Sequence, residues 1–337
     1  MDTQPTPASL ARALAGVLGA GEVQSLARLT GGATKATWSF DWVGAQSREP
    51  LILQQTPPRA ADLAPGAQRP PKLDAAQDAA VMDAARAAGV PAPRVRHVLS
   101  PDDGLGCGYV TDRVAGETLG RRIVSDAAFD TVRPALAAQA GEILAAIHRM
   151  PVGGLPFLQR LRAADELAIY AALLRGHERT HPALAWAIRW IGERLPREER
   201  AGVVHADFRT GNLIVDPAQG IRCVLDWEIA RIGDPMHDLG VLCMRSWRFG
   251  GAGGAGEAGG FGSREALYAA YERAGGGRVD PARVRFWEAM SNLKWAIACV
   301  RRGLAGTGGE GNVELAAIGR RLEEPLWDFM TLATAKE

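Results

Sequence analysis

Asp207, Asn212 and Asp226 are the residues of this 337-residue chain whose types and spacing best support chemistry. Asn212 precedes the apolar run LIV, and Asp226 follows a second apolar run, CVL. The residues DPAQG between the runs are typical of a turn. Two antiparallel strands joined by this turn would bring Asn212 and Asp226 to the same end, close to Asp207.

Phosphoryl transfer to a hydroxyl group needs this combination of side chains. One carboxylate orients the hydroxyl and accepts its proton, while a second carboxylate and an amide oxygen bind magnesium. Magnesium prefers oxygen ligands and keeps several waters, so a few protein ligands suffice. We therefore expect Asp207 and Asn212 to be catalytic, and Asn212 and Asp226 to bind Mg²⁺.

The order of three motifs resembles one known family. HADFRTGN (205–212) is similar to the HxDxxxxN catalytic loop of aminoglycoside phosphotransferases and their choline-kinase and protein-kinase relatives. DWE (226–228) resembles the family's metal-binding motif, and GDPMHDLG (233–240) resembles the stretch that follows it. The subgroup most similar is the kinase-like domain of acyl-CoA dehydrogenase fusion proteins. The resemblance covers residues 29–302 and implies that His205 and Asp238 are scaffold residues.

The resemblance also implies nucleotide-binding positions in the N-terminal third. The segment GGATKAT (31–37) is similar to a turn whose backbone approaches phosphates, although a GG turn is also common in simple hairpins. The segment GYVTDRVAGE (108–117) resembles the adenine-binding hinge, with an ordinary connecting strand as the alternative. The cofactor-binding residues expected from these segments are Gly31, Gly32, Thr34, Lys35, Thr111 and Arg113, and the expected nucleotide is ATP, with GTP as the alternative.

One departure from the family pattern concerns charge. The family places Lys or Arg on its third strand, where this chain has Gln54, and the acid that pairs with that cation is Asp78. By this resemblance Gln54 and Asp78 are also expected cofactor-binding residues. A neutral amide cannot neutralise phosphate charge. Lys35 could supply the missing cation from the glycine turn, or it could be an exposed loop lysine.

These motifs need a scaffold with an antiparallel sheet and a helical part. We expect an α+β, bilobed, protein-kinase-like fold, with a nucleotide-binding lobe over residues 1–112 and a catalytic helical lobe over residues 113–337. Apolar periodicity and breaker residues predict helices over 9–18 (capped by Ser9), 73–88, 131–149, 161–174, 182–195, 238–247, 263–274 and 281–302. Strands are predicted over 23–29, 37–43, 51–55, 94–99, 108–113, 211–215 and 222–226. The glycine-rich segment 250–262 is predicted to be a flexible surface loop, with a phosphate-binding loop as the alternative.

Composition excludes several other classes. The formal net charge is +1, so nothing indicates a nucleic-acid partner. No apolar run is long enough to span a bilayer and no signal peptide is visible, which predicts a cytoplasmic protein without a membrane partner. The four cysteines show no metal or disulfide spacing. The expected partner is a small molecule with a hydroxyl group, and the oligomeric state is not encoded legibly.

The acceptor itself is encoded only weakly. Acidic and basic residues are about balanced in the C-terminal part, which argues against a cationic aminoglycoside, and the subgroup resemblance favours a hydroxyacyl compound or another metabolic alcohol. The candidate acceptor-pocket residues, most of whose aromatic members are also good core residues, are Glu228, Tyr271, Glu272, Trp287, Asn292 and Trp295.

Three functions follow from these observations. The first is an ATP-dependent small-molecule kinase with an alcohol as acceptor, and the intact trio at 207, 212 and 226 favours it. The second is a pseudokinase that only binds a nucleotide or ligand, and Gln54 favours it. The third, a metal-dependent phosphoesterase, fits less well because the six histidines form no ligand cluster.

Overall fold

The N-terminal part of the chain is an antiparallel five-stranded sheet with the order β1-β2-β3-β5-β4. The computed structural model describes residues 7–29, 35–56, 72–177, 179–197, 200–250, 256–306 and 317–335. This five-stranded sheet confirms the antiparallel sheet predicted for the N-terminal part. Its strands are β1 (Glu22–Leu29), β2 (Ala36–Val43), β3 (Arg48–Thr56), β4 (Val95–Val98) and β5 (Cys107–Asp112).

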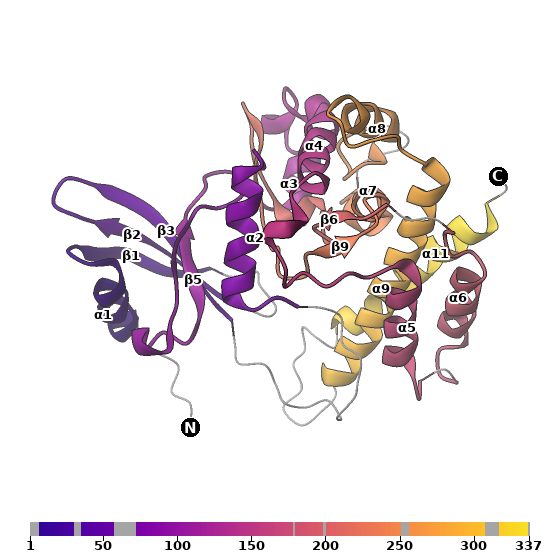
Figure 1. Ribbon diagram of the computed structural model, residues 1–337, viewed down its shortest axis with the longest axis horizontal. Coiled ribbons are helices and arrows are strands. Elements are labelled where there is room, and N and C mark those ends of the chain that lie inside the picture. Colours follow the sequence, from indigo (N-terminus) through magenta and orange to yellow (C-terminus); the bar gives the residue numbers. More distant parts are fainter. Residues whose placement is uncertain are drawn as a thin grey trace.

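One helix covers each face of this sheet. Because side chains alternate along a strand, Leu53 and Val110 face one side, where α1 (Pro7–Leu18) buries its apolar residues. Tyr109 faces the other side and packs with α2 (Ala75–Ala87), which lies between the sheet and the helical part (Figure 1). The first helix begins at Pro7, so Ser9 lies in its first turn and does not cap it. Asp74 caps α2 and accepts from the Gln77 amide at 2.8 Å.

The C-terminal part is mostly helical, as predicted. Its helices are α3 (Gly120–Ser125), α4 (Arg133–His148), α5 (Ala163–Leu174), α6 (Pro182–Gly192), α7 (Met236–Cys243), α8 (Arg264–Arg273), α9 (Pro281–Gly306) and α11 (Glu323–Thr334). Neither α3 nor α11 was predicted, and the helix expected over 238–247 is α7 followed by a separate 3-10 turn, Arg245–Trp247. Fully buried Trp227, Trp287 and Phe208 fill the centre of this part.

Two short antiparallel strand pairs carry the functional segments. The predicted pair is present as β7 (Leu213–Asp216) and β8 (Gly220–Val224). A second pair, β6 (Gly202–Val204) with β9 (Arg231–Gly233), was not predicted because each strand has only three residues. The β6–β9 pair brings the chain just before the catalytic loop beside the chain just after Asp226.

The division of the chain at residue 112 stays a prediction. Val81 and Met82 of α2 belong to the same buried apolar cluster as the C-terminal helices, so burial does not separate the two parts at that point. Across the described ranges, the helices are too short or too polar to cross a membrane.

Candidate active site

The backbone just before Asp207 is held in an uncommon conformation by buried partners. Ala206 has a φ of +69°, in the left-handed region that residues other than glycine seldom occupy. Asp238 accepts hydrogen bonds from the amides of His205 (2.8 Å) and Ala206 (2.7 Å). From the other side, Lys294 Nζ donates to the Ala206 carbonyl at 3.2 Å. Both polar backbone groups of Ala206 are thereby satisfied, which fixes the loop before any ligand binds.

Asp238 can hold this loop because its charge is stabilised. Burial alone would raise its pKa, but hydrogen bonds from His148 (3.1 Å) and His237 (3.4 Å) hold the pKa well below its ordinary value. The Nε2 of His205 in turn lies 2.9 Å from the carbonyl oxygen of Leu225. Burial lowers the pKa of His205, so the neutral ring donates to that carbonyl through Nε2. These contacts agree with scaffold roles for His205 and Asp238.

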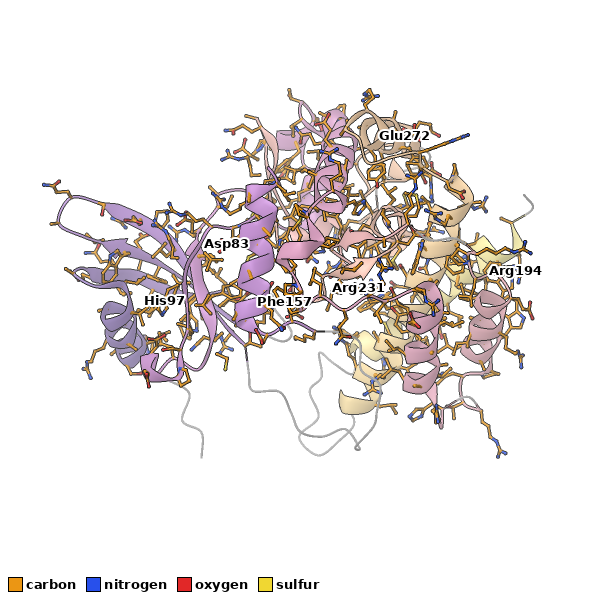
Figure 2. The ribbon with its side chains drawn as sticks, in the orientation of Figure 1. Asp83, His97, Phe157, Arg194, Arg231 and Glu272 are labelled. Carbon is orange, nitrogen blue, oxygen red and sulfur yellow. The ribbon has the colours of Figure 1, made fainter. Side chains whose placement is uncertain are left out.

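A second group of buried charges lies behind the loop. Arg231, labelled inside the helical part in Figure 2, forms a buried ion pair with Glu166 of α5. Burial, and next the charge of Arg231, lower the pKa of Lys294. Sequence reasoning gave Lys294 no role, because helical periodicity does not show that its ammonium group reaches the catalytic loop.

Asp207 and Asn212 contact each other directly. The Asn212 side-chain nitrogen donates to the Asp207 backbone oxygen at 2.9 Å and to Asp207 Oδ2 at 2.8 Å. Both bonds use the amide nitrogen, so the amide oxygen is the atom left to bind a metal. The Leu225 amide donates to the Asn212 carbonyl at 2.8 Å, which places Asp226 next to this pair. The predicted trio is thus gathered by the β7–β8 pair and the segment that follows it.

Lys35 lies at the centre of a cluster of carboxylates. Its Nζ is 2.8 Å from Glu228 Oε2, 3.0 Å from Asp226 Oδ1 and 3.6 Å from Asp78 Oδ2. The Lys35 side chain is only 7% exposed, so it is not a solvated loop lysine. Burial alone would lower its pKa, but the three carboxylates together raise it above its ordinary value. Lys35 is therefore a fixed cation between the metal-binding candidate Asp226 and the α2 acid Asp78.

Gln54 has a different partner. Antiparallel pairing places it opposite Tyr109, and its side-chain oxygen contacts the Tyr109 hydroxyl. The same hydroxyl donates to Asp78 Oδ2 at 2.9 Å. Gln54 thus joins the network that positions Asp78, while the cation comes from the chain before β2.

The family model described as "Phosphotransferase enzyme family" matches residues 25–287, a span that includes Lys35, Asp78, the catalytic loop and Asp238. The chain belongs to the phosphotransferase enzyme family. Because the match crosses the sheet and most of the helical part, it covers both sides of the site described above.

Several solved proteins share the fold of this chain. A Ralstonia eutropha protein assigned as an aminoglycoside phosphotransferase has a TM-score of 0.72 at 21% identity, over 97% of this chain and 99% of that chain. A choline/ethanolamine kinase family protein from Mesorhizobium loti has a TM-score of 0.56 at 21% identity, over 91% and 90%. A mutant of aminoglycoside phosphotransferase APH(4)-Ia, solved with ADP and hygromycin B, has a TM-score of 0.62 at 19% identity, over 95% and 98%. At these identities the likeness shows the kinase-like fold alone.

The curated relatives match only locally. Mouse acyl-CoA dehydrogenase family member 10 is 42% identical over 64 residues, which is 19% of this chain and 6% of that protein. Human acyl-CoA dehydrogenase family member 11 is 30% identical over 122 residues, 34% of this chain and 16% of that protein. The phosphotransferase chain therefore spans a small fraction of each relative's length.

The structure describes only some of the residues predicted to bind the nucleotide. Gly31, Gly32 and Thr34 lie outside the described residues. The Arg113 amide donates to the Pro50 carbonyl at 2.9 Å, and its guanidinium donates to Asp41 at 2.7 Å. Thr111 is buried within β5, paired on both sides. Adenine binding by this stretch stays a prediction, and both of these residues already have partners within the sheet.

Several candidate acceptor-pocket residues already have partners within the protein. Glu228 contacts Lys35 and, through Oε1 at 3.0 Å, Lys72, so it belongs with the nucleotide side. Trp287 is buried and donates to Asp234 at 2.8 Å. Tyr271 is buried against His148, with its hydroxyl 2.8 Å from Nδ1. Glu272 Oε1 accepts from the Val279 amide at 2.7 Å.

Trp295 and Asn292 keep unpaired polar atoms. Trp295 lies against Trp247 with 5.3 Å between ring centroids. The Trp295 Nε1 and the Asn292 side-chain oxygen are buried and have no hydrogen-bond partner within the described ranges. Of the acceptor candidates, these two therefore stay the residues to test by mutation.

The second half of the glycine-rich segment is part of the scaffold. Residues 256–262 were predicted to form a flexible surface loop, but Ala258 and Phe261 are buried. The Gly259 carbonyl accepts from Thr210 Oγ1 of the catalytic loop at 2.7 Å. The prediction was wrong for these residues because glycine content reports backbone freedom and cannot report a tertiary contact.

Gly260→Ala should destabilise the fold by about 3 kcal/mol. Gly260 has a φ of +82°, and a Cβ there would overlap the carbonyl oxygen of Arg248. Chemical denaturation of the purified variant measures the loss. Gly176→Ala is the matched control, since its φ is +86° with nothing near the added carbon, and it should lose only about 1 kcal/mol. Equal losses in the two variants would show that the overlap has no effect.

The pH dependence of activity should report Asp78. Burial raises the pKa of Asp78 to about 6 against the opposing effects of Lys35 and Tyr109. For a carboxyl with a raised pKa, the negative charge is present above about pH 6 and disappears as the pH falls through that value. We expect kcat/KM to fall on this acidic limb because neutral Asp78 no longer attracts Lys35. In Asp78→Asn the limb should vanish and activity should be low throughout; an unchanged limb would assign it to another group.

Proposed function

We propose that this family member transfers the γ-phosphoryl group of ATP to a hydroxyl group of a small molecule. Family membership supports small-molecule phosphotransfer, and the nucleotide, metal and acceptor are inferences from the site. The observation that carries the proposal is the position of Lys35. Its ammonium group contacts both the α2 acid Asp78 and the metal-binding candidate Asp226, which is where a phosphate-binding cation is needed.

The residues present fit Mg²⁺ bound together with a nucleotide. Within the described ranges, no three His, Cys, Asp or Glu side chains form a cage for a metal. Magnesium in phosphotransferases is commonly held by one or two protein oxygens plus phosphate oxygens and water. Asp226 and the amide oxygen of Asn212 would hold it here. When bound, Mg²⁺ would neutralise charge on the phosphate oxygens.

The protein's own groups account for positioning and proton transfer. The acceptor hydroxyl donates to the Asp207 carboxylate, which takes the proton as the new oxygen–phosphorus bond forms. The bond from the γ-phosphorus to the bridging oxygen breaks, and that oxygen leaves with ADP. Asn212 fixes the Asp207 carboxylate through its 2.8 Å hydrogen bond. Lys35 stabilises the negative charge of the phosphates.

Hydroxyacyl compounds are the first acceptors to test, because the local relatives are named acyl-CoA dehydrogenase family members. The experiment measures ADP release from Mg·ATP, and in parallel GDP release from Mg·GTP, across a panel of alcohols and hydroxyacyl thioesters. Acceptor-dependent release, with a phosphorylated product seen by mass spectrometry, is the expected result. Hydrolysis that no acceptor accelerates would contradict the proposal.

A second candidate is a nucleotide-binding module without catalysis, favoured by the neutral Gln54 on β3. A ligand that binds only the native state raises apparent stability. A thermal shift with Mg·ATP, combined with no product from any acceptor, would select this candidate. The absence of both a thermal shift and a product would exclude both candidate functions.

A further inference from the structure

Four side chains, the first of which contacts Asp207, form a stack for which phosphoryl transfer itself has no need. We call Arg209, Trp247, Trp295 and Arg302 the arginine–tryptophan stack. The Arg209 guanidinium carbon lies 4.4 Å from the centre of the Trp247 ring. Trp247 and Trp295 are 5.3 Å apart, and the Arg302 guanidinium carbon is 5.3 Å from the Trp295 ring. The stack runs from the catalytic loop to α9 with a cation at each end.

Arg209 has hydrogen-bonding capacity to spare. Its Nε lies 3.2 Å from each oxygen of Asp207, which fixes the guanidinium beside the proposed base. Within the described ranges, no hydrogen bond uses its terminal Nη1 or Nη2 groups, although its side chain is only 23% exposed. These two groups form a planar fork that matches a carboxylate or phosphate.

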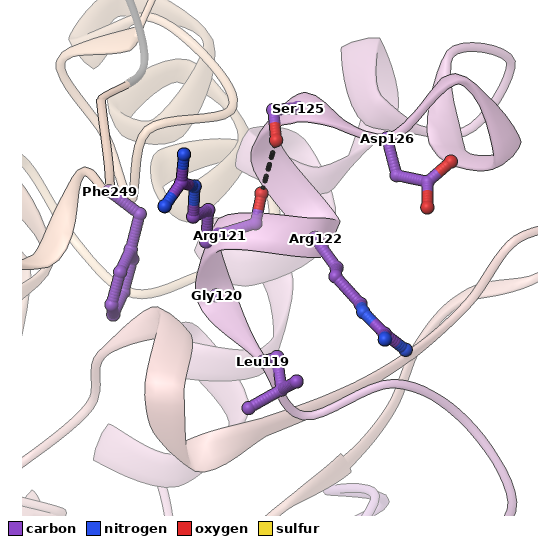
Figure 3. A pocket seen from close by; sticks show the side chains of 7 residues that line it. All are labelled: Leu119, Gly120, Arg121, Arg122, Ser125, Asp126 and Phe249. Carbon is purple, nitrogen blue, oxygen red and sulfur yellow. Dashed lines mark hydrogen bonds between the residues drawn. The ribbon is translucent and has the colours of Figure 1, made fainter.

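A cavity of about 530 Å³ lies between α3 and Phe249. Figure 3 shows its lining, in which the Phe249 ring faces α3 and the guanidinium of Arg121 lies on the same side of that helix. Gly211 of the catalytic loop lies close to Phe249 of this lining. A Cβ built on Gly211 would lie 4.0 Å from the Phe249 ring and would overlap Arg209 Nη1. The Nη1 end of Arg209 therefore lies beside the same glycine as Phe249, a residue that lines the cavity.

Charge at the cavity is unevenly compensated. Arg122 pairs with Glu117 at 3.1 Å, and Asp126 accepts from the Ala128 amide at 3.0 Å. Arg121 has no ion pair with any described residue. Asp126 and Arg122 point away from Phe249 in Figure 3, so the charge on that side of α3 is positive.

The carboxylates near the stack are already paired with arginines. Glu288 lies 2.7 Å from Arg264, and Asp328 lies 3.9 Å from Arg245. A polycationic acceptor would need unpaired carboxylates here, whereas an anionic acceptor meets the free ends of Arg121 and Arg209.

We propose that this cavity and the arginine–tryptophan stack select acceptors that carry a carboxylate or phosphate group away from the reacting hydroxyl. The inference rests on the proposed function and adds the charge of the acceptor. Arg209 binds the anionic group through Nη1 and Nη2 while its Nε keeps Asp207 in place. Trp247 and Trp295 pack against the uncharged body of the acceptor, and Arg121 binds an anion that extends into the cavity.

The test compares matched probes by calorimetry on the full chain saturated with Mg·ADP. Glycerol 3-phosphate is compared with glycerol, and 3-hydroxybutyrate with butane-1,3-diol, so that the phosphate and carboxylate sources are separated. Kanamycin is the cationic comparator. The anionic probe that the site prefers, whether it carries phosphate or carboxylate, should bind at least about tenfold more tightly than its uncharged partner.

Three single variants assign the selectivity. Arg209→Gln should raise the Kd of the anionic probe about tenfold and leave the uncharged partner unchanged, which a merely structural defect would not do. Arg121→Gln should raise it several-fold. Arg189→Gln, an exposed arginine on α6, should change neither value.

Three results would overturn the inference: equal or tighter binding of the uncharged partner or kanamycin, no effect of Arg209→Gln, or no binding of either anionic probe at 10 mM. The affinity for Mg·ADP is measured in the same titrations. If the chain does not bind Mg·ADP, the proposed phosphotransfer is contradicted. The charge preference is then measured with the same probes added without nucleotide.

Discussion

Replacing Lys35 by methionine is expected to lower kcat/KM for Mg·ATP about 10²–10³-fold. Methionine keeps much of the stem of the side chain and removes the charge that sits 2.8–3.6 Å from three carboxylates. Those carboxylates would then repel both one another and the phosphates of the nucleotide. Steady-state ADP release measures the loss, and calorimetry with Mg·ADP shows how much of it is binding.

Lys72→Met is the matched control for this variant. Lys72 Nζ also contacts Glu228, at 3.0 Å, but its side chain is 32% exposed. Its loss should change kcat/KM by only a few-fold. Equal losses of kcat/KM in the two variants would show that the ion pair with Glu228, and not the position of Lys35 among the three carboxylates, controls activity.

A double variant tests whether a lysine at position 54 can take over the role of Lys35. In Lys35→Met with Gln54→Lys, the lysine returns to β3, opposite Tyr109 and near Asp78. We expect at least about tenfold recovery relative to Lys35→Met, because the new ammonium reaches the same carboxylate from a neighbouring strand. No recovery would mean that position 54 cannot supply a phosphate-binding cation here.

Asp207→Asn should lower kcat about 10²–10⁴-fold with little change in nucleotide affinity. An amide of the same shape cannot accept the proton of the acceptor hydroxyl, and among described side chains the Asp207 carboxylate accepts hydrogen bonds only from Arg209 and Asn212. Rapid-quench measurement of product in a single turnover separates this chemical step from product release. Asp207→Asn with near-normal kcat would remove Asp207 as the base.

Asp83→Asn is the control for the charge change itself. Asp83 is exposed on α2, where Figure 2 labels it. The variant should keep full activity and stability, since an isolated surface charge contributes little. A large effect at Asp83 would make the result at Asp207 uninterpretable as catalysis.

Local patterns predicted most of the elements around the site. The strands β2 and β3 and the turn between β7 and β8 follow directly from the residue types of these segments. The short pair β6–β9 and helix α3 were missed because three-residue strands and six-residue helices carry too little periodicity. The start of α1 was misplaced because both Pro7 and Ser9 are good helix-start residues.

The sequence by itself determined the kinase-like arrangement of Asp207, Asn212 and Asp226, because a strand, a turn and a strand leave the chain little choice of where these ends meet. Only the tertiary structure decided which lysine neutralises the site. Lys35 and Asp226 are 191 positions apart, and their contact depends on how the sheet lies against the helical part. The same holds for Lys294 on Ala206 and for Gly259 on Thr210. Such contacts are set by packing between elements, which no local pattern of residues records.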